Sequence, residues 1–164
     1  MARRWSSTFT PFPGAVCFYG EMCRERRVCV KQIVWDDSFS VGVTVLDTQH
    51  HRIIDMINLL LSEPDADVTS ETLSDILTLI TTYSREHFET EEGLLEQYGY
   101  PDLPAHREQH VSFRESAGAF CVATMGGHAA VPEHVLRYLK EWWTHHILTT
   151  DMQYRPFFRE KGIA

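Results

Sequence analysis

The sequence predicts an all-α fold, an antiparallel up-down-up-down four-helix bundle with an extended N-terminal arm. Four long segments of the 164-residue chain repeat apolar residues at the i, i+3, i+4 spacing of a helix with one buried face. Short stretches rich in proline, glycine or aspartate separate these segments, and such connections make successive helices antiparallel neighbours. The length suits one domain with a substantial core.

The first two helices are expected to follow an extended segment over residues 33–46. Asp47 looks like the N-cap of the first helix, which then runs to about Glu63. The second helix spans about residues 70–98 and stops at the Gly-Tyr-Pro sequence of residues 99–101.

The third helix is expected over about residues 103–124, before two adjacent glycines. Pro132 suits the first turn of a fourth helix, which continues to about Thr150. A short terminal turn over residues 154–159 follows, limited by Pro156.

Charge is distributed unevenly along the chain. Residues 1–32 carry six basic and two acidic side chains, a net charge of +4. Because the net charge of the whole chain is −8, the remaining residues have a net charge of −12. We expect a basic, poorly ordered extension over residues 1–32 and a helical domain over residues 33–160. A redox-responsive or partner-binding tail is the alternative for the extension, because it holds Cys17, Cys23 and Cys29.

Composition also limits the partners. An acidic balance argues against nucleic acid binding, which needs a basic face. No stretch reaches the roughly 18 apolar residues that span a bilayer. Prolines interrupt any signal-peptide core near the N-terminus, so we expect a cytoplasmic monomer that binds no membrane. Cys121, in the apolar pattern of the third helix, is expected to be an inert core thiol.

Every expected helix places an ionisable residue on its apolar stripe. Such a residue costs several kcal/mol in a core unless it is paired or bound to metal. Two helices carry pairs at i, i+4, a spacing that stacks both side chains on one face. Asp151 lies five residues after His146 and joins the set if the helix ends near Thr150 and the carboxylate folds back over the core. The inward set is His50, His87, Glu91, His106, His110, His146 and Asp151.

The other four histidines are expected on the surface or rim of the bundle. They are His51, His128, His134 and His145.

Five imidazoles, two carboxylates and no thiolate favour two five- or six-coordinate ions that share carboxylates. A closed zinc site would use four ligands, usually with cysteine, whereas mixed nitrogen and oxygen ligands suit iron and also accommodate manganese or zinc. The sequence contains neither the Glu-x-x-His pairs of ferritin-like proteins nor the HExxH motif of zinc proteases.

Five segments in this order resemble the bacterial hemerythrins, and the resemblance covers residues 34–158. They are VWDDSFSVGVTVLDTQH (34–50), HFETEE (87–92), YP (100–101), HREQH (106–110) and HILTTD (146–151).

The resemblance implies a non-haem di-iron centre in which one iron keeps an open position where O2 binds end-on and reversibly. By that resemblance, His106, His110 and His146 bind one iron, His50 and His87 bind the other, and Glu91 and Asp151 bridge both.

Trp142, Trp143 and Ile147 are candidates to line the oxygen pocket. Trp143 stands where members of the family usually carry leucine, and three outcomes are open. The bulkier indole slows O2 entry, shields the bound ligand, or faces outward.

The leading hypothesis is therefore an oxygen carrier or store that is not an enzyme, with O2 as its ligand. A di-iron peroxidase or oxidase would use the same seven residues and also need a general acid, for which no inward tyrosine stands out, although Tyr83 lies one turn before His87. A module that signals O2 or iron occupancy is the third hypothesis.

Overall fold

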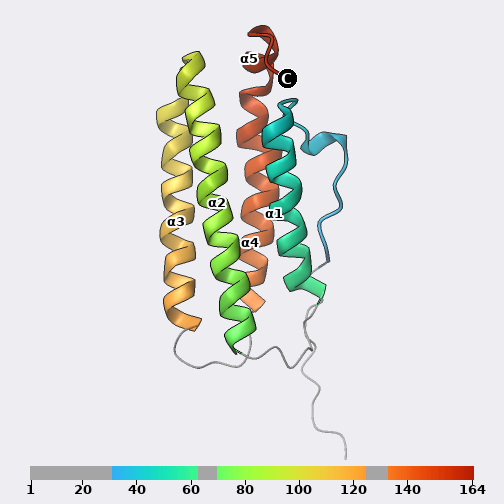
Figure 1. The fold of residues 1–164 in the computed structure, drawn as a ribbon, viewed down its shortest axis with the longest axis vertical. Coiled ribbons are helices and arrows are strands. Elements are labelled where there is room, and N and C mark those ends of the chain that lie inside the picture. Colours follow the sequence, from blue (N-terminus) through green and yellow to red (C-terminus); the bar gives the residue numbers. More distant parts are fainter. Residues whose placement is uncertain (1–30, 63–69, 125–132) are drawn as a thin grey trace, which may run out of the picture.

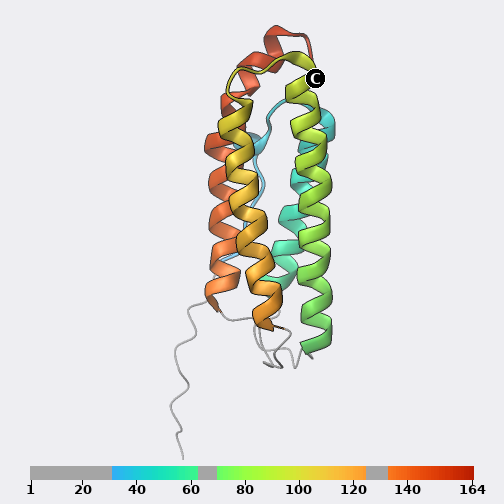
Figure 2. The same cartoon turned by 90° about the vertical axis from the view of Figure 1, so that its left-hand side faces the viewer.

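The computed structural model describes residues 31–62, 70–124 and 133–164, and over these ranges it is helical and contains no strand. The long helices run alternately down and up one bundle, so that neighbours are antiparallel (Figure 1). The predicted fold class is confirmed. Seen from the side, α3 and α4 lie together opposite α1 and α2 (Figure 2). The four helices are α1 (Thr44–Ser62), α2 (Ser70–Tyr98), α3 (Leu103–Thr124) and α4 (Glu133–His145).

An extended arm and a short C-terminal helix flank the bundle (Figure 1). The arm contains a 3-10 turn, η1 (Asp37–Phe39), and lies beside α1. Its Ile33 N–H donates to Asn58 Oδ1 at 2.7 Å, and Asn58 Nδ2 donates back to the Ile33 carbonyl at 2.8 Å. At the other end, α5 (Arg155–Glu160) follows α4 through two irregular turns, at the end of the bundle where α2 joins α3.

The helix ends agree with the sequence except at α1 and α4. Helices α2 and α3 begin and end where they were predicted to. Helix α1 begins at Thr44, so the prediction of Asp47 as its N-cap is wrong. Asp47 lies inside the first turn and reaches back to the arm, where it accepts hydrogen bonds from Val41 N–H at 2.8 Å and the Ser40 hydroxyl at 2.6 Å.

Buried apolar side chains form two clusters along the bundle axis. The larger cluster includes Ile57 of α1 and Leu139 of α4, and the smaller includes Leu46 of α1 and Leu95 of α2. On α1, α2 and α3, residues of the two clusters lie on either side of the inward histidines, and after α4 the chain reaches the smaller cluster at Tyr154 and Phe158, so a polar layer separates two apolar ones.

Several predictions concern positions outside the described residues. These are the extension with Cys17, Cys23 and Cys29, the helix ends at Glu63 and Pro132, His128, and the side chains of Cys121 and His134. Within the described ranges, none of the helices is long and apolar enough to cross a membrane.

Candidate metal centre

All seven residues predicted as ligands are buried in the polar layer. They fall into two groups, and within each group one possible ligand atom from every residue lies within 4.8 Å of the others. Glu91 belongs to both groups, so the two groups adjoin. The groups are Glu91, His106, His110 and His146, and His50, His87, Glu91 and Asp151.

Helical spacing explains how four of these side chains meet. His87 and Glu91 lie one turn apart on α2, and His106 and His110 lie one turn apart on α3, so each pair shares a face. The apolar residues before and after each pair pack into the core and turn that face inward. Ordinary hydrophobic burial therefore positions the polar layer.

Asp151 reaches the site because the backbone widens after α4. Over η2 (His146–Thr150) the chain forms a π-helical turn, in which the N–H of Asp151 donates to the carbonyl of His146. This i to i+5 bond adds one residue to the turn and brings Asp151 back to the face of His146. Helix α4 itself ends at His145, but the π-helical turn continues it to Thr150, where the sequence placed the helix end, and a 3-10 turn, η3 (Asp151–Gln153), follows.

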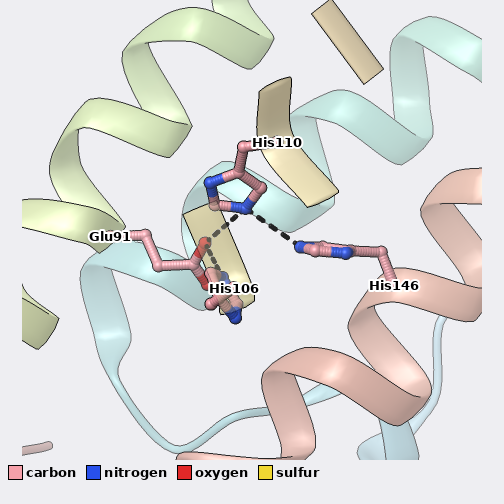
Figure 3. Close-up of side chains that lie close together, drawn as sticks. All are labelled: Glu91, His106, His110 and His146. Carbon is pink, nitrogen blue, oxygen red and sulfur yellow. Dashed lines mark hydrogen bonds and ion pairs between the residues drawn. The ribbon is translucent and has the colours of Figure 1, made fainter. Parts of the chain in front are cut away.

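The first group is closely spaced around the Glu91 carboxylate (Figure 3). Glu91 Oε2 lies 3.0 Å from His106 Nε2 and 3.1 Å from His110 Nε2. His110 Nε2 and His146 Nε2 are 3.0 Å apart, although two neutral imidazole nitrogens that both carry lone pairs gain nothing from contact.

In the second group, each of two histidines faces one of the two carboxylates. His50 Nε2 lies 3.3 Å from Asp151 Oδ2, and His87 Nε2 lies 3.8 Å from Glu91 Oε2. Asp151 Oδ1 instead lies 3.1 Å from His146 Nε2 in the first group. The two oxygens of Asp151 thus face different groups, as a bridging carboxylate requires.

These residues fit a pair of cations. His50 Nε2, His87 Nε2 and both Asp151 oxygens are buried with no hydrogen-bond partner among the described residues, a costly arrangement unless a cation satisfies them. The donor set has imidazoles and carboxylates and no thiolate, which suits iron and also accommodates manganese or zinc.

Burial prepares the imidazoles as ligands. It lowers the pKa of His50 to about 4 and holds the pKa values of His87 and His146 well below their usual 6.5. For His106 burial acts in the same direction, but the hydrogen bond and charge of Glu91 outweigh it and raise the pKa. Neutral imidazole is the form that binds a cation.

The two carboxylates have opposite pKa shifts. Burial, and then the charge of Glu91, raise the pKa of Asp151 well above its usual 3.8. Burial also acts to raise the pKa of Glu91, but hydrogen bonds from His106 and His110 together with nearby histidine charges hold it well below 4.5. Two carboxylates in one dry site repel each other, and cations placed between them would remove that repulsion.

Side chains that belong to neither group orient two of the imidazoles through hydrogen bonds. His87 Nδ1–H donates to Gln49 Oε1 at 3.1 Å, and His110 Nδ1–H donates to Glu92 Oε1 at 2.8 Å. Glu92 is held in turn by Arg107, whose Nε donates to Glu92 Oε2 at 3.0 Å. Each of these bonds fixes the tautomer that leaves Nε2 free to bind a cation.

Sequence reasoning missed Tyr154. Its buried hydroxyl donates a hydrogen bond to Glu91 Oε1, and burial followed by the charges of Asp151 and Glu91 raises the pKa of this phenol well above 10. Tyr83, which the sequence places one turn before His87, is half-buried, and its hydroxyl accepts from Arg52 Nη1 at 3.0 Å. The signal for Tyr154 was its position three residues after Asp151, beyond the expected end of the helix.

The three pocket candidates lie in different environments. Trp142 is half-buried and stacks on the His146 ring with centroids 4.3 Å apart. Trp143 and Ile147 are fully buried, which rules out an outward-facing Trp143. His51 and His145 are exposed, as predicted.

Fold and site together define a helical bundle with a buried histidine–carboxylate centre. The profile of the family described as Hemerythrin HHE cation binding domain matches residues 41–158. The chain therefore belongs to the hemerythrin family, and the resemblance to bacterial hemerythrins is confirmed.

Similar proteins agree with this assignment. The chain is 32% identical to a bacteriohemerythrin of Pseudomonas paraeruginosa, over 74% of this chain and 78% of that protein. It is also 32% identical to a myohemerythrin of Theromyzon tessulatum, over 74% of this chain and 89% of that protein. A crystal structure of wild-type hemerythrin matches with a TM-score of 0.68 at 28% identity, covering 76% of this chain and 95% of the other.

Proposed function

We propose that this chain holds two non-haem iron ions and binds O2 reversibly as an oxygen carrier or store. The observation that carries the proposal is that the two carboxylate oxygens of Asp151 face two adjoining groups of buried donors. One oxygen lies 3.1 Å from His146 Nε2 and the other lies 3.3 Å from His50 Nε2. The similarity to proteins named bacteriohemerythrin and myohemerythrin supports the same function.

In this proposal the chain supplies unequal ligand sets. The group of His106, His110 and His146 offers three imidazoles, and the group of His50 and His87 offers two. When bound, the iron pair supplies the two electrons that reversible reaction with O2 requires. The position beside His50 and His87 is then the one left for O2, while Glu91 and Asp151 neutralise the charge of both ions.

The surrounding apolar side chains keep water away from this position. Phe88, Trp143 and Ile147 are each 0% exposed and pack in the larger cluster next to the polar layer. A dry apolar environment is open to a small neutral molecule and hinders the water and reductants that would oxidise the centre irreversibly.

Two measurements test the proposal. Iron analysis of the purified protein should give two ions per chain. After anaerobic reduction, a charge-transfer band should appear when O2 is admitted and disappear when it is removed. One ion per chain, or none, would contradict the di-iron assignment.

Tyr154 provides a specific reason to test peroxidase or oxidase activity. A buried phenol that contacts Glu91 is a group that oxidase chemistry could use, and the sequence had not suggested one. Because its pKa is raised well above 10, the hydroxyl stays protonated near neutral pH and remains bonded to Glu91. Irreversible bleaching, or rapid consumption of peroxide in the presence of a reductant, would favour the enzyme over the carrier.

A further inference from the structure

Trp143 brings a polar group into the apolar side of the centre. It is 0% exposed, and its indole Nε1 is buried with no hydrogen-bond partner among the described residues. An indole nitrogen can only donate, and a buried donor without an acceptor destabilises the fold. The indole N–H therefore needs an explanation.

Two of the rings packed against Trp143 accept hydrogen bonds poorly. Its indole stacks on Phe88 with centroids 5.5 Å apart and meets Phe113 edge to face at 5.6 Å. Aromatic faces are weak acceptors. The apolar packing therefore fixes the indole without satisfying its N–H.

Trp143 lies on the side of the centre that offers fewer imidazoles. Its ring centroid is 5.6 Å from that of His87, which itself lies 4.6 Å from the ring of His50. The indole is 6.5 Å from the ring of His146 in the other group. The indole ring that carries the unsatisfied donor thus lies beside the position that the proposed function leaves for an incoming ligand.

We propose that the indole N–H of Trp143 donates a hydrogen bond to the small ligand held beside His50 and His87, which makes Trp143 a specificity-determining residue. This inference rests on the proposed function, because the ligand needs a metal to hold it. A donor in a dry site stabilises acceptors that carry negative charge more than neutral ones. The site therefore favours anionic ligands, and ligands that gain negative charge on binding, over neutral poor acceptors.

Azide binding to the oxidised, iron-loaded full chain tests the proposal. Trp143→Phe removes the N–H and keeps an aromatic ring, whereas Trp143→Leu removes both the N–H and the bulk. Because a hydrogen bond to a charged group contributes about 1.5–3 kcal/mol, both variants should raise the azide Kd about ten- to hundredfold. Trp35→Phe is the matched control, since Trp35 stacks on Phe39 and His51, outside the centre, and should leave the Kd unchanged.

The two Trp143 variants also separate hydrogen bonding from bulk. In stopped-flow experiments, Trp143→Leu should change the O2 association or autoxidation rate more than Trp143→Phe, because only the leucine variant clears the space of the ring. Identical traces for the leucine variant and the wild type would show that the indole does not restrict the ligand's path.

A spectroscopic measurement on the wild type needs no variant. The indole N–H stretch of tryptophan in infrared difference spectra should shift to lower frequency when azide binds, and Trp143→Phe should abolish that difference. An unchanged azide Kd in Trp143→Phe with two irons retained, or no N–H shift in the wild type, would overturn the inference. Absence of iron from the wild type would instead overturn the proposed function.

Discussion

Glu92 is expected to control how tightly the first group holds iron, although it does not face the centre. It contacts His110 Nδ1 at 2.8 Å, and its side chain is only 17% exposed. A charge-assisted hydrogen bond of this kind contributes about 1.5–3 kcal/mol, and partners behind a ligating histidine typically account for about ten- to hundredfold in metal affinity. We expect Glu92→Ala to weaken iron binding by that factor and Glu92→Gln by less, because an amide oxygen still accepts but without charge.

Glu96 provides a matched control for this experiment. It pairs with the same arginine, Arg107, at 2.9 Å, but its side chain is 67% exposed. Glu96→Gln removes a neighbouring carboxylate while leaving the bond between Glu92 and His110 intact. Iron release to a coloured ferrous chelator should therefore follow the order Glu92→Ala, then Glu92→Gln, then Glu96→Gln and wild type together.

Two results would refute the reasoning. Glu92→Ala that released iron no faster than the wild type would mean that the outer bond does not tune His110. Equal losses in Glu92→Ala and Glu96→Gln would mean that the surface charge near Arg107 matters and the contact with His110 does not.

Three further predictions concern stability. Tyr154→Phe leaves Glu91 without one hydrogen bond and should lower the free energy of unfolding by about 1–3 kcal/mol in urea titrations; an unchanged midpoint would contradict this. Asp47→Ala removes the acceptor of the Val41 N–H and should cost about 1–3 kcal/mol, measured as a lower Tm, while Asp55→Ala on the exposed face of α1 serves as control. The pKa of His50 is about 4 in the folded protein and about 6.5 in the unfolded chain, so the unfolded chain takes up the proton first as the pH falls. The contribution of neutral His50 to the free energy of unfolding is therefore complete above pH 6.5 and is lost as the pH falls towards 4. In the apoprotein, His50→Leu should therefore flatten the fall of unfolding free energy over that window by about 1.4 kcal/mol per pH unit, and parallel slopes for variant and wild type would refute it.

The sequence was sufficient for the fold because the relevant signals are local. Proline and glycine mark the ends of α2 and α3, and the helical repeat identifies the inward face of each helix. The same repeat placed His87 and Glu91 on one face of α2 before any tertiary contact was known. The structure brings all seven expected residues together, and their role as iron ligands remains a prediction.

What the sequence could not predict depends on tertiary packing. Trp142 and Trp143 were both candidates for the oxygen pocket, but only Trp143 is fully buried and Trp142 is half-buried. Adjacent positions both lie within the width of an apolar stripe, so the helical repeat alone does not show which indole turns inward. Tyr154 was missed for a related reason. Its position in the site depends on the π-helical turn, and the helical repeat of apolar residues does not predict such a turn.

That turn also limits how the protein can change in evolution. Each residue of an α-helix advances the chain by about 100°, so deleting one residue from 147–150 would restore a regular helix and swing the following segment around its axis. Asp151 and Tyr154 would leave the centre together, although neither had been substituted. The number of residues between His146 and Asp151 is therefore under stricter constraint than the identity of exposed residues such as Thr149 within the turn. A chain with a single-residue insertion or deletion in this segment should keep the helical bundle but lose the buried centre.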